Sequence, residues 1–287
     1  MACIPGVSIE RSGKGQAFIQ LINGWNTNTD FFVYPIDAFT YSERHFDIRI
    51  GSSSFSSHRI RLDIEQNDRA IHGDIAIGQS TSLRTSFFSP GIMGWYAFVP
   101  FMECYHGIVS LNHHLSGHLV IDDRRIDFNG GRGYIEKDWG TSFPSSWVWL
   151  QSNHFGSDNA SFMLSIARIP WITGSFIGFL CVLHVNDVEY RFATYTGSTV
   201  ERLHIEDRSV HVQIADNLYH LDILASQGTP AGLKAPVNGG MDRIIAESVS
   251  SEVEVRLETK TGEGVFNDTG IHGGMEIAGN INELFET

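Results

Sequence analysis

The sequence predicts an all-β protein, built as an antiparallel sandwich or barrel with few short helices. Short apolar runs recur along the chain, and several of them alternate polar and apolar residues with the period of two that a half-buried strand requires. Clusters of glycine and serine separate the runs, for example at residues 51–54 and 78–82. Helical periodicity is almost absent. The 287 residues are enough for two ordinary domains or one large β domain.

The expected strands can be followed in order along the chain. Residues 17–22 are an apolar run that ends at Asn23-Gly24, the strongest short hairpin signal. Residues 46–50 and 60–64 alternate strictly. Further strands are expected at residues 31–35, 75–77, 119–121, 162–166, 188–195, 210–214, 219–224 and 253–257. One helix is expected, over residues 241–249.

A proline marks the expected boundary between two parts of the chain. Pro170 interrupts the run of strands between Ile169 and Trp171. We therefore expect a first lobe over residues 1–168 and a second, unequal β lobe over residues 169–287.

Composition excludes several classes of partner. The net charge is −13 and no basic block is present, so nucleic acid is not an expected partner and an anionic membrane surface is disfavoured. No stretch is long and apolar enough for a transmembrane span, and no signal peptide is recognisable. The three cysteines are widely spaced and odd in number, which favours a reducing environment. We expect a cytoplasmic protein, with at most peripheral association with a membrane.

Motifs for nucleotide binding and serine hydrolysis are absent from the sequence, which has no G-x-S-x-G, P-loop or G-x-G-x-x-G pattern. Histidines crowd residues 106–118, but their spacing matches no familiar zinc motif. A strand would also hold His114 and His118 roughly 13 Å apart. We therefore predict no metal site.

Residues 133–155 are the most distinctive stretch. Glu136, Lys137 and Asp138 stand directly against Trp139, and Trp147 and Trp149 follow on one face of an expected strand. A carboxyl group held among indoles is one way in which an enzyme raises the pKa of an acid. The alternative interpretation is structural: Lys137 pairs with a carboxylate at a strand end and the tryptophans belong to the core.

A second polar segment lies in apolar surroundings at residues 103–106. In a strand, Glu103 and Tyr105 share one face while Cys104 and His106 share the other. One of these faces could line a lipophilic cavity, or the strand could have one face in solvent. Cys104 is expected to be a buried structural thiol.

Three stretches together resemble the tocopherol cyclase family: residues 94–107 (GWYAFVPFMECYHG), residues 133–155 (GYIEKDWGTSFPSSWVWLQSNHF) and residues 233–245 (LKAPVNGGMDRII). Residues 4–9 (IPGVSI) and 17–20 (AFIQ) fit the same pattern. The family pattern has an aromatic segment before the IPG residues, and this chain starts almost at IPG. Two alternatives stay open: the first strand is missing, which would leave a sheet edge open, or the sequence is a truncated one.

The resemblance implies two lipocalin-like β lobes and a reaction that closes a chromanol ring. A prenyl double bond is protonated, and the neighbouring phenol oxygen captures the tertiary cation, without a cofactor. Asp138 or Glu136 is then the expected acid, Lys137 holds one carboxylate ionised, and His106 or Asn153 orients the phenol. The expected substrate-binding residues are Trp139, Trp147, Trp149, Tyr105, Glu103, Asn153 and Trp95.

The expected partner is thus a lipophilic small molecule, a prenylated quinol or a similar unsaturated compound that is cyclised or hydrated. The alternative is a lipocalin-like carrier that binds such a molecule without changing it. In that case residues 136–138 are a structural ion-pair cluster.

Overall fold

The structure is a computed structural model that describes residues 1–25, 27–157, 159–172 and 174–285. This part of the chain is nearly all β, as predicted, and its sheets are antiparallel. It also contains four short 3-10 helices: η1 (Ile36–Ala38), η2 (Gly94–Phe98), η3 (Thr194–Thr196) and η4 (Ile281–Leu284). Among the described residues, no helix has the length and apolar character needed to cross a membrane.

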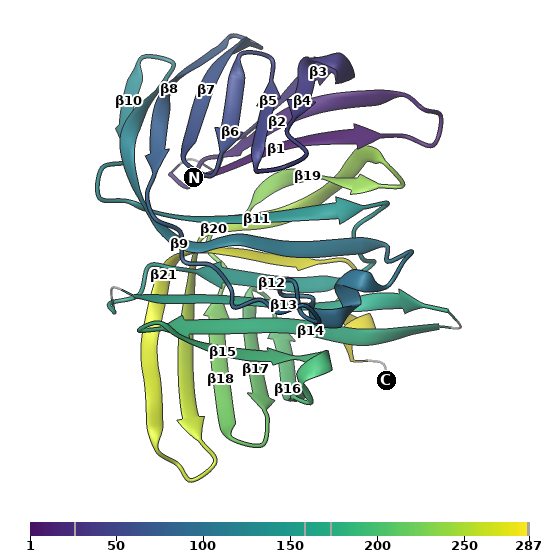
Figure 1. Cartoon of the computed structure of the whole chain (residues 1–287), viewed down its shortest axis with the longest axis vertical. Helices are drawn as coiled ribbons and strands as arrows, with labels where there is room; N and C mark the ends of the chain where they lie inside the picture. The colour runs from purple at the N-terminus through teal and green to yellow at the C-terminus, as the bar shows by residue number, and fades with distance from the viewer. Residues whose placement is uncertain (26, 158, 173, 286–287) are drawn as a thin grey trace.

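The strands form three sheets (Figure 1). The first has the order β1 (Ala2–Ile9), β2 (Gly15–Ile22), β3 (Thr29–Pro35). The second has the order β10 (Arg124–Asp127), β9 (Cys104–Ile121), β8 (Arg69–Ile77), β7 (Arg59–Gln66), β6 (Ser53–Ser56), β5 (Asp47–Ile50), β4 (Phe39–Tyr41), and β11 (Arg132–Gly140) also pairs with β9. The third has the order β15 (Val188–Ala193), β14 (Gly174–Val185), β13 (Ala160–Trp171), β12 (Trp147–Ser152), β21 (Gly264–Ala278), β20 (Gly240–Thr259), β18 (Tyr219–Ser226), β17 (Ser209–Ala215), β16 (Thr199–Glu206), and β19 (Ala231–Val237) pairs with β20.

Two large apolar cores hold the sheets together. One joins the first sheet to the second, and the alternation predicted for residues 60–64 places Leu62 and Ile64 in it. The other fills the concave side of the third sheet, where Leu150, Leu164 and Cys181 are buried. Alternate residues are buried on strands such as β7 and β18, whereas β2 and β13 are buried over continuous runs, and this burial accounts for the sandwich-like packing.

Strand β9 carries the chain from one sheet to the next. Residues 115–121 pair with β8 in the second sheet, whereas residues 104–114 pair with β11. The two-stranded β9–β11 ribbon crosses between the upper and lower sheets in Figure 1. Its Ile108 packs in one apolar cluster with Met163 of β13 and Val182 of β14. The ribbon therefore lies against the third sheet, and this junction holds the candidate site.

The predicted helix over residues 241–249 is wrong, because these residues belong to β20. Met241, Ile245 and Glu247 are buried, and the intervening Ile244 is exposed. Hydrogen bonding to β19 and a pair of β-branched isoleucines favour the extended chain over a helix.

The chain passes from the second sheet to the third between β11 and β12. The boundary expected at residue 168 falls within β13, which pairs along its whole length with β14. The division into two lobes stays a prediction.

Candidate active site

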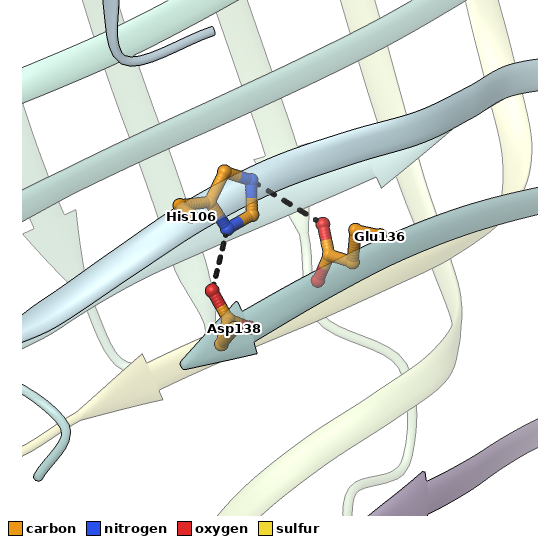
Figure 2. A group of neighbouring side chains, drawn as sticks. All are labelled: His106, Glu136 and Asp138. Atoms are coloured by element: carbon orange, nitrogen blue, oxygen red, sulfur yellow. Dashed lines mark hydrogen bonds and ion pairs between the residues drawn. The ribbon is translucent and has the colours of Figure 1, made fainter. Parts of the chain in front are cut away.

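The β9–β11 ribbon brings together His106, Glu136 and Asp138 (Figure 2). His106 and Asp138 are direct partners across the two strands, and Glu136 lies two residues before Asp138 on the same face of β11. Between Gly133 and Glu136 the register of β11 shifts twice. Irregularities of this kind re-aim side chains without ending the strand pairing.

The imidazole of His106 lies between the two carboxylates. Its Nδ1 is 2.7 Å from Asp138 Oδ1, and its Nε2 is 3.5 Å from Glu136 Oε2. The side chain of His106 is only 12% exposed. Burial alone would lower its pKa, but the charges of Asp138 and Glu136 and the hydrogen bond that His106 donates to Asp138 outweigh burial and raise the pKa to about 9. His106 is thus an imidazolium at neutral pH.

Three donors surround one oxygen of Glu136. Its Oε2 accepts hydrogen bonds from the Tyr134 hydroxyl at 2.6 Å and from the Trp149 indole N–H at 3.1 Å, and it also faces His106. Burial is the largest cause that raises the pKa of Glu136, to about 7, and the charge of Asp138 adds to the rise. The charge of His106 and the two hydrogen bonds act in the opposite direction. This carboxyl group can therefore exchange a proton near neutral pH.

The third sheet adds two more buried carboxyl groups that the sequence interpretation missed. Glu276 of β21 stands directly opposite Trp149 of β12 on one side and Glu247 of β20 on the other. Its Oε2 accepts a hydrogen bond of 2.5 Å from the indole N–H of Trp147. Burial raises the pKa of Glu276 to about 8 and that of Glu247 well above its ordinary range. The available signal in the sequence was a single acid between Met275 and Ile277 in an apolar run.

Lys137, Trp139 and Tyr105 lie on the opposite face of the ribbon from His106. The ammonium of Lys137 is 4.7 Å from the centre of the Trp139 ring, and Tyr105 stacks on that ring with centroids 5.4 Å apart. Trp139 is 47% exposed. The structure thus gives Lys137 an aromatic partner, and among the described residues it forms no ion pair with Glu136 or Asp138.

Asn153 and Trp95 have structural contacts. Asn153 is buried, and its amide donates to the carbonyl of Gly133 at 2.7 Å, which braces the start of β11. Trp95 stacks on Tyr96 with ring centroids 4.1 Å apart and is partly exposed.

Glu103 lines a cavity of about 370 Å³ together with Phe143, Arg168 and Arg243, among other residues. Burial raises the pKa of Glu103. Phe143 packs edge-on against Trp147 at 5.6 Å, and the guanidinium of Arg243 lies 4.7 Å from the centre of the same indole. Trp147 thus contacts two residues of the cavity wall and also donates a hydrogen bond to Glu276.

The ligand atoms of His106, Glu136 and Asp138 all lie within 4.8 Å of one another, a spacing that would also suit a metal ion. A histidine must be neutral to bind a metal. The two carboxylates favour the imidazolium form of His106, which has no free lone pair. We therefore interpret the cluster as a site of proton transfer.

Comparisons with known proteins identify the family of this chain. The family model described as "Tocopherol cyclase-like" matches residues 83–279. A probable chloroplastic tocopherol cyclase of Oryza sativa subsp. japonica is 30% identical over 113 residues, which cover 37% of this chain and 23% of the rice protein. The chloroplastic tocopherol cyclase of Zea mays is 34% identical over 74 residues, or 26% of this chain and 16% of the maize protein. The matched region thus spans less than a quarter of either plant protein.

Among solved structures, kievitone hydratase from Nectria haematococca is similar with a TM-score of 0.52 and 12% sequence identity. The match covers 96% of this chain and 88% of the hydratase. At this level of identity the likeness concerns the fold alone.

Proposed function

The chain belongs to the tocopherol cyclase-like family, and from this premise we propose that it is an acid-catalysed cyclase or hydratase of an unsaturated, lipophilic substrate. The names of the plant relatives suggest a prenylated quinol as the first compound to test. The observation that carries the proposal is Glu136, which is partly buried beside His106 and has a pKa of about 7 that suits general acid–base chemistry at neutral pH.

The reaction needs a proton donor, a proton acceptor and shelter from bulk water. Protonation of a substituted double bond forms one C–H bond and leaves a tertiary cation on the other carbon. A hydroxyl oxygen of the substrate then forms the C–O bond of a ring and loses its proton, so that no proton is consumed overall. If water attacks the cation instead, the product is a tertiary alcohol.

The residues of the site fit these needs. Asp138 holds His106 as an imidazolium, and His106, Tyr134 and Trp149 stabilise the ionised form of Glu136. Trp147 and Trp149 supply indole rings next to the carboxyl groups, and such rings stabilise a nearby cation by about 1–2 kcal/mol.

Incubation of the protein with a prenylated hydroquinone in D₂O tests this proposal. A cyclase or hydratase places one non-exchangeable deuterium on the carbon beside the new C–O bond, which mass spectrometry and NMR detect. Glu136→Gln should lower turnover strongly, whereas Glu254→Gln, a change at an exposed acid of β20, should retain it. Tight binding with recovery of the compound unchanged and free of deuterium would instead support the carrier function.

A further inference from the structure

Glu276 reaches the candidate site from a different sheet than Glu136 does. It lies on β21 and is the direct cross-strand neighbour of Trp149, whose indole N–H donates to Glu136. The adjacent tryptophan on the same face, Trp147, donates its N–H to Glu276. Two indoles on one strand thus each contact a different carboxyl group, one from the ribbon and one from the third sheet.

The surroundings of the two carboxyl groups favour opposite protonation states. Glu136 accepts two hydrogen bonds and faces the His106 imidazolium, which all favour a carboxylate. Glu276 faces another acid, Glu247, directly across the strand pair, and Glu247 is only 5% exposed. Among the described residues, no hydrogen bond or ion pair involves the carboxyl of Glu247. Two carboxyl groups side by side do not both ionise readily, so this pair retains at least one proton. Burial raises the pKa values of both acids, and for Glu276 it outweighs the hydrogen bond from Trp147, which favours the carboxylate.

We infer that Glu276 is the proton donor of the reaction and Glu136 the proton acceptor, an assignment that rests on the function proposed above. Glu276 transfers its proton to the less substituted carbon of the double bond, where the π electrons form the new C–H bond. The hydroxyl oxygen attacks the resulting cation, and its proton passes to Glu136. Exchange with water then returns a proton to Glu276 and removes one from Glu136.

The contacts of Trp147 indicate the side from which a substrate reaches Glu276. The 370 Å³ cavity is walled by Phe143 and Arg243, and both side chains pack on Trp147. Trp147 lies behind these two side chains, and its indole N–H donates to Glu276. The side chain of Trp147 has to move for this approach, because it is 4% exposed in the structure.

The charges around Glu276 define the expected pH window. His106, Glu136 and Asp138 act on it from the ribbon, Glu247 faces it from β20, and the Met1 amine lies near Glu247. Burial is the main cause of the raised pKa of Glu276, about 8, and the corresponding pKa of Glu136 is about 7. The productive state, with Glu276 neutral and Glu136 ionised, is therefore most populated between about pH 7 and pH 8, which predicts a bell-shaped profile of kcat.

The test compares the pH profiles of the wild type, Glu276→Gln and Glu136→Gln with the prenylated hydroquinone in D₂O. Glutamine keeps an oxygen that can accept the bond from Trp147, so the fold should be retained. Glu276→Gln should lower kcat by about 10²–10⁴-fold with little change in KM, and its residual activity should no longer decline above pH 8. Glu136→Gln should lose the decline below pH 7 instead. If either residue had a purely structural role, its replacement would not remove the decline on only one side of the pH profile.

The inference would be refuted, while the proposed function stands, if Glu276→Gln kept the wild-type kcat and both declines of the pH profile. It would also be refuted if Glu276→Gln lost the decline below pH 7 and Glu136→Gln lost the decline above pH 8. An infrared band of a protonated carboxyl group at pH 7.5 tests the same assignment without turnover. The band should lose intensity in Glu276→Gln, and an unchanged band would overturn the donor role. Absence of turnover in the wild type, with such a band present, would refute the proposed function instead.

Discussion

Replacing Glu276 by glutamine should make the stability of the folded protein less dependent on pH. The pKa of Glu276 rises from its ordinary value of 4.5 to about 8 in the folded protein, mainly through burial. The folded state therefore holds a proton that the unfolded chain has already released at neutral pH. The stability that this proton contributes is fully present below pH 4.5 and is lost as the pH rises through about 8. Glutamine at this position has no proton to lose.

The size of the effect follows from the length of this pH interval. Between pH 6 and pH 9, the free energy of unfolding falls mainly in the two pH units below the pKa that Glu276 has in the folded protein. The fall there is about 1.4 kcal/mol per pH unit. The wild type should therefore lose roughly 2–3 kcal/mol more than Glu276→Gln over that range. His106 also favours folding at lower pH, because its pKa is raised to about 9. The charge of Glu276 is the smallest cause of that shift, so most of the contribution of His106 is common to both proteins.

Urea titrations at fixed ionic strength give the free energy of unfolding at each pH. The matched control is Glu254→Gln, which changes an exposed acid on the neighbouring strand β20 and should follow the wild type. Parallel curves for the wild type and Glu276→Gln would mean that Glu276 is already ionised at pH 6 in the folded protein. The argument for a neutral carboxyl group at this position would then fail.

Three further variants test the ribbon. Asp138→Asn should return the pKa of His106 from about 9 towards 6.5, as followed by NMR titration of the imidazole, and should abolish turnover while binding and folding persist; unchanged turnover would remove Asp138 from the mechanism. Trp149→Phe removes a donor to the Glu136 carboxylate and should move the acid limb of the kcat profile upward by about one pH unit; an unmoved limb would contradict the role of this bond. Lys137→Met should leave both limbs in place, because Lys137 lies on the opposite face of the ribbon, and a displaced limb would restore it as a partner of the carboxylates.

Local patterns in the sequence predicted several of the strands and part of the candidate site. The alternation around Leu62 and Ile64 predicts a half-buried strand, and burial of these residues confirms it. The charges of residues 136–138 beside Trp139 attract attention because they are contiguous. Contiguity misled in one respect, since neighbouring strand residues face opposite ways and Lys137 therefore points away from Glu136 and Asp138.

The rest of the site depends on pairings between strands that are distant in the chain. Glu276 reaches Trp149 because β12 pairs with β21, across more than 100 residues of sequence, and Glu247 joins them only through the register of β20. A spacing rule along the chain cannot find such partners. The incorrect helix prediction for residues 241–249 also kept Glu247 from being recognised. In strand β20, Glu247 shares a face with Met241 and Ile245, whereas on a helix it would not.

The two tryptophans of β12 explain how a donor and an acceptor of similar pKa can coexist. Two carboxyl groups in contact would share one proton and behave as a single group. Trp147 and Trp149 are successive residues on one face of a strand, roughly 7 Å apart along it, and each gives its N–H to a different carboxyl group. The strand thereby favours separation of Glu276 from Glu136. Because the two acids also belong to different sheets, the packing of the ribbon on the third sheet sets how far apart they lie. The cost of burying these acids is then a consequence of the catalytic geometry, and substitutions that relieve it should stabilise the fold above pH 8 while slowing the reaction.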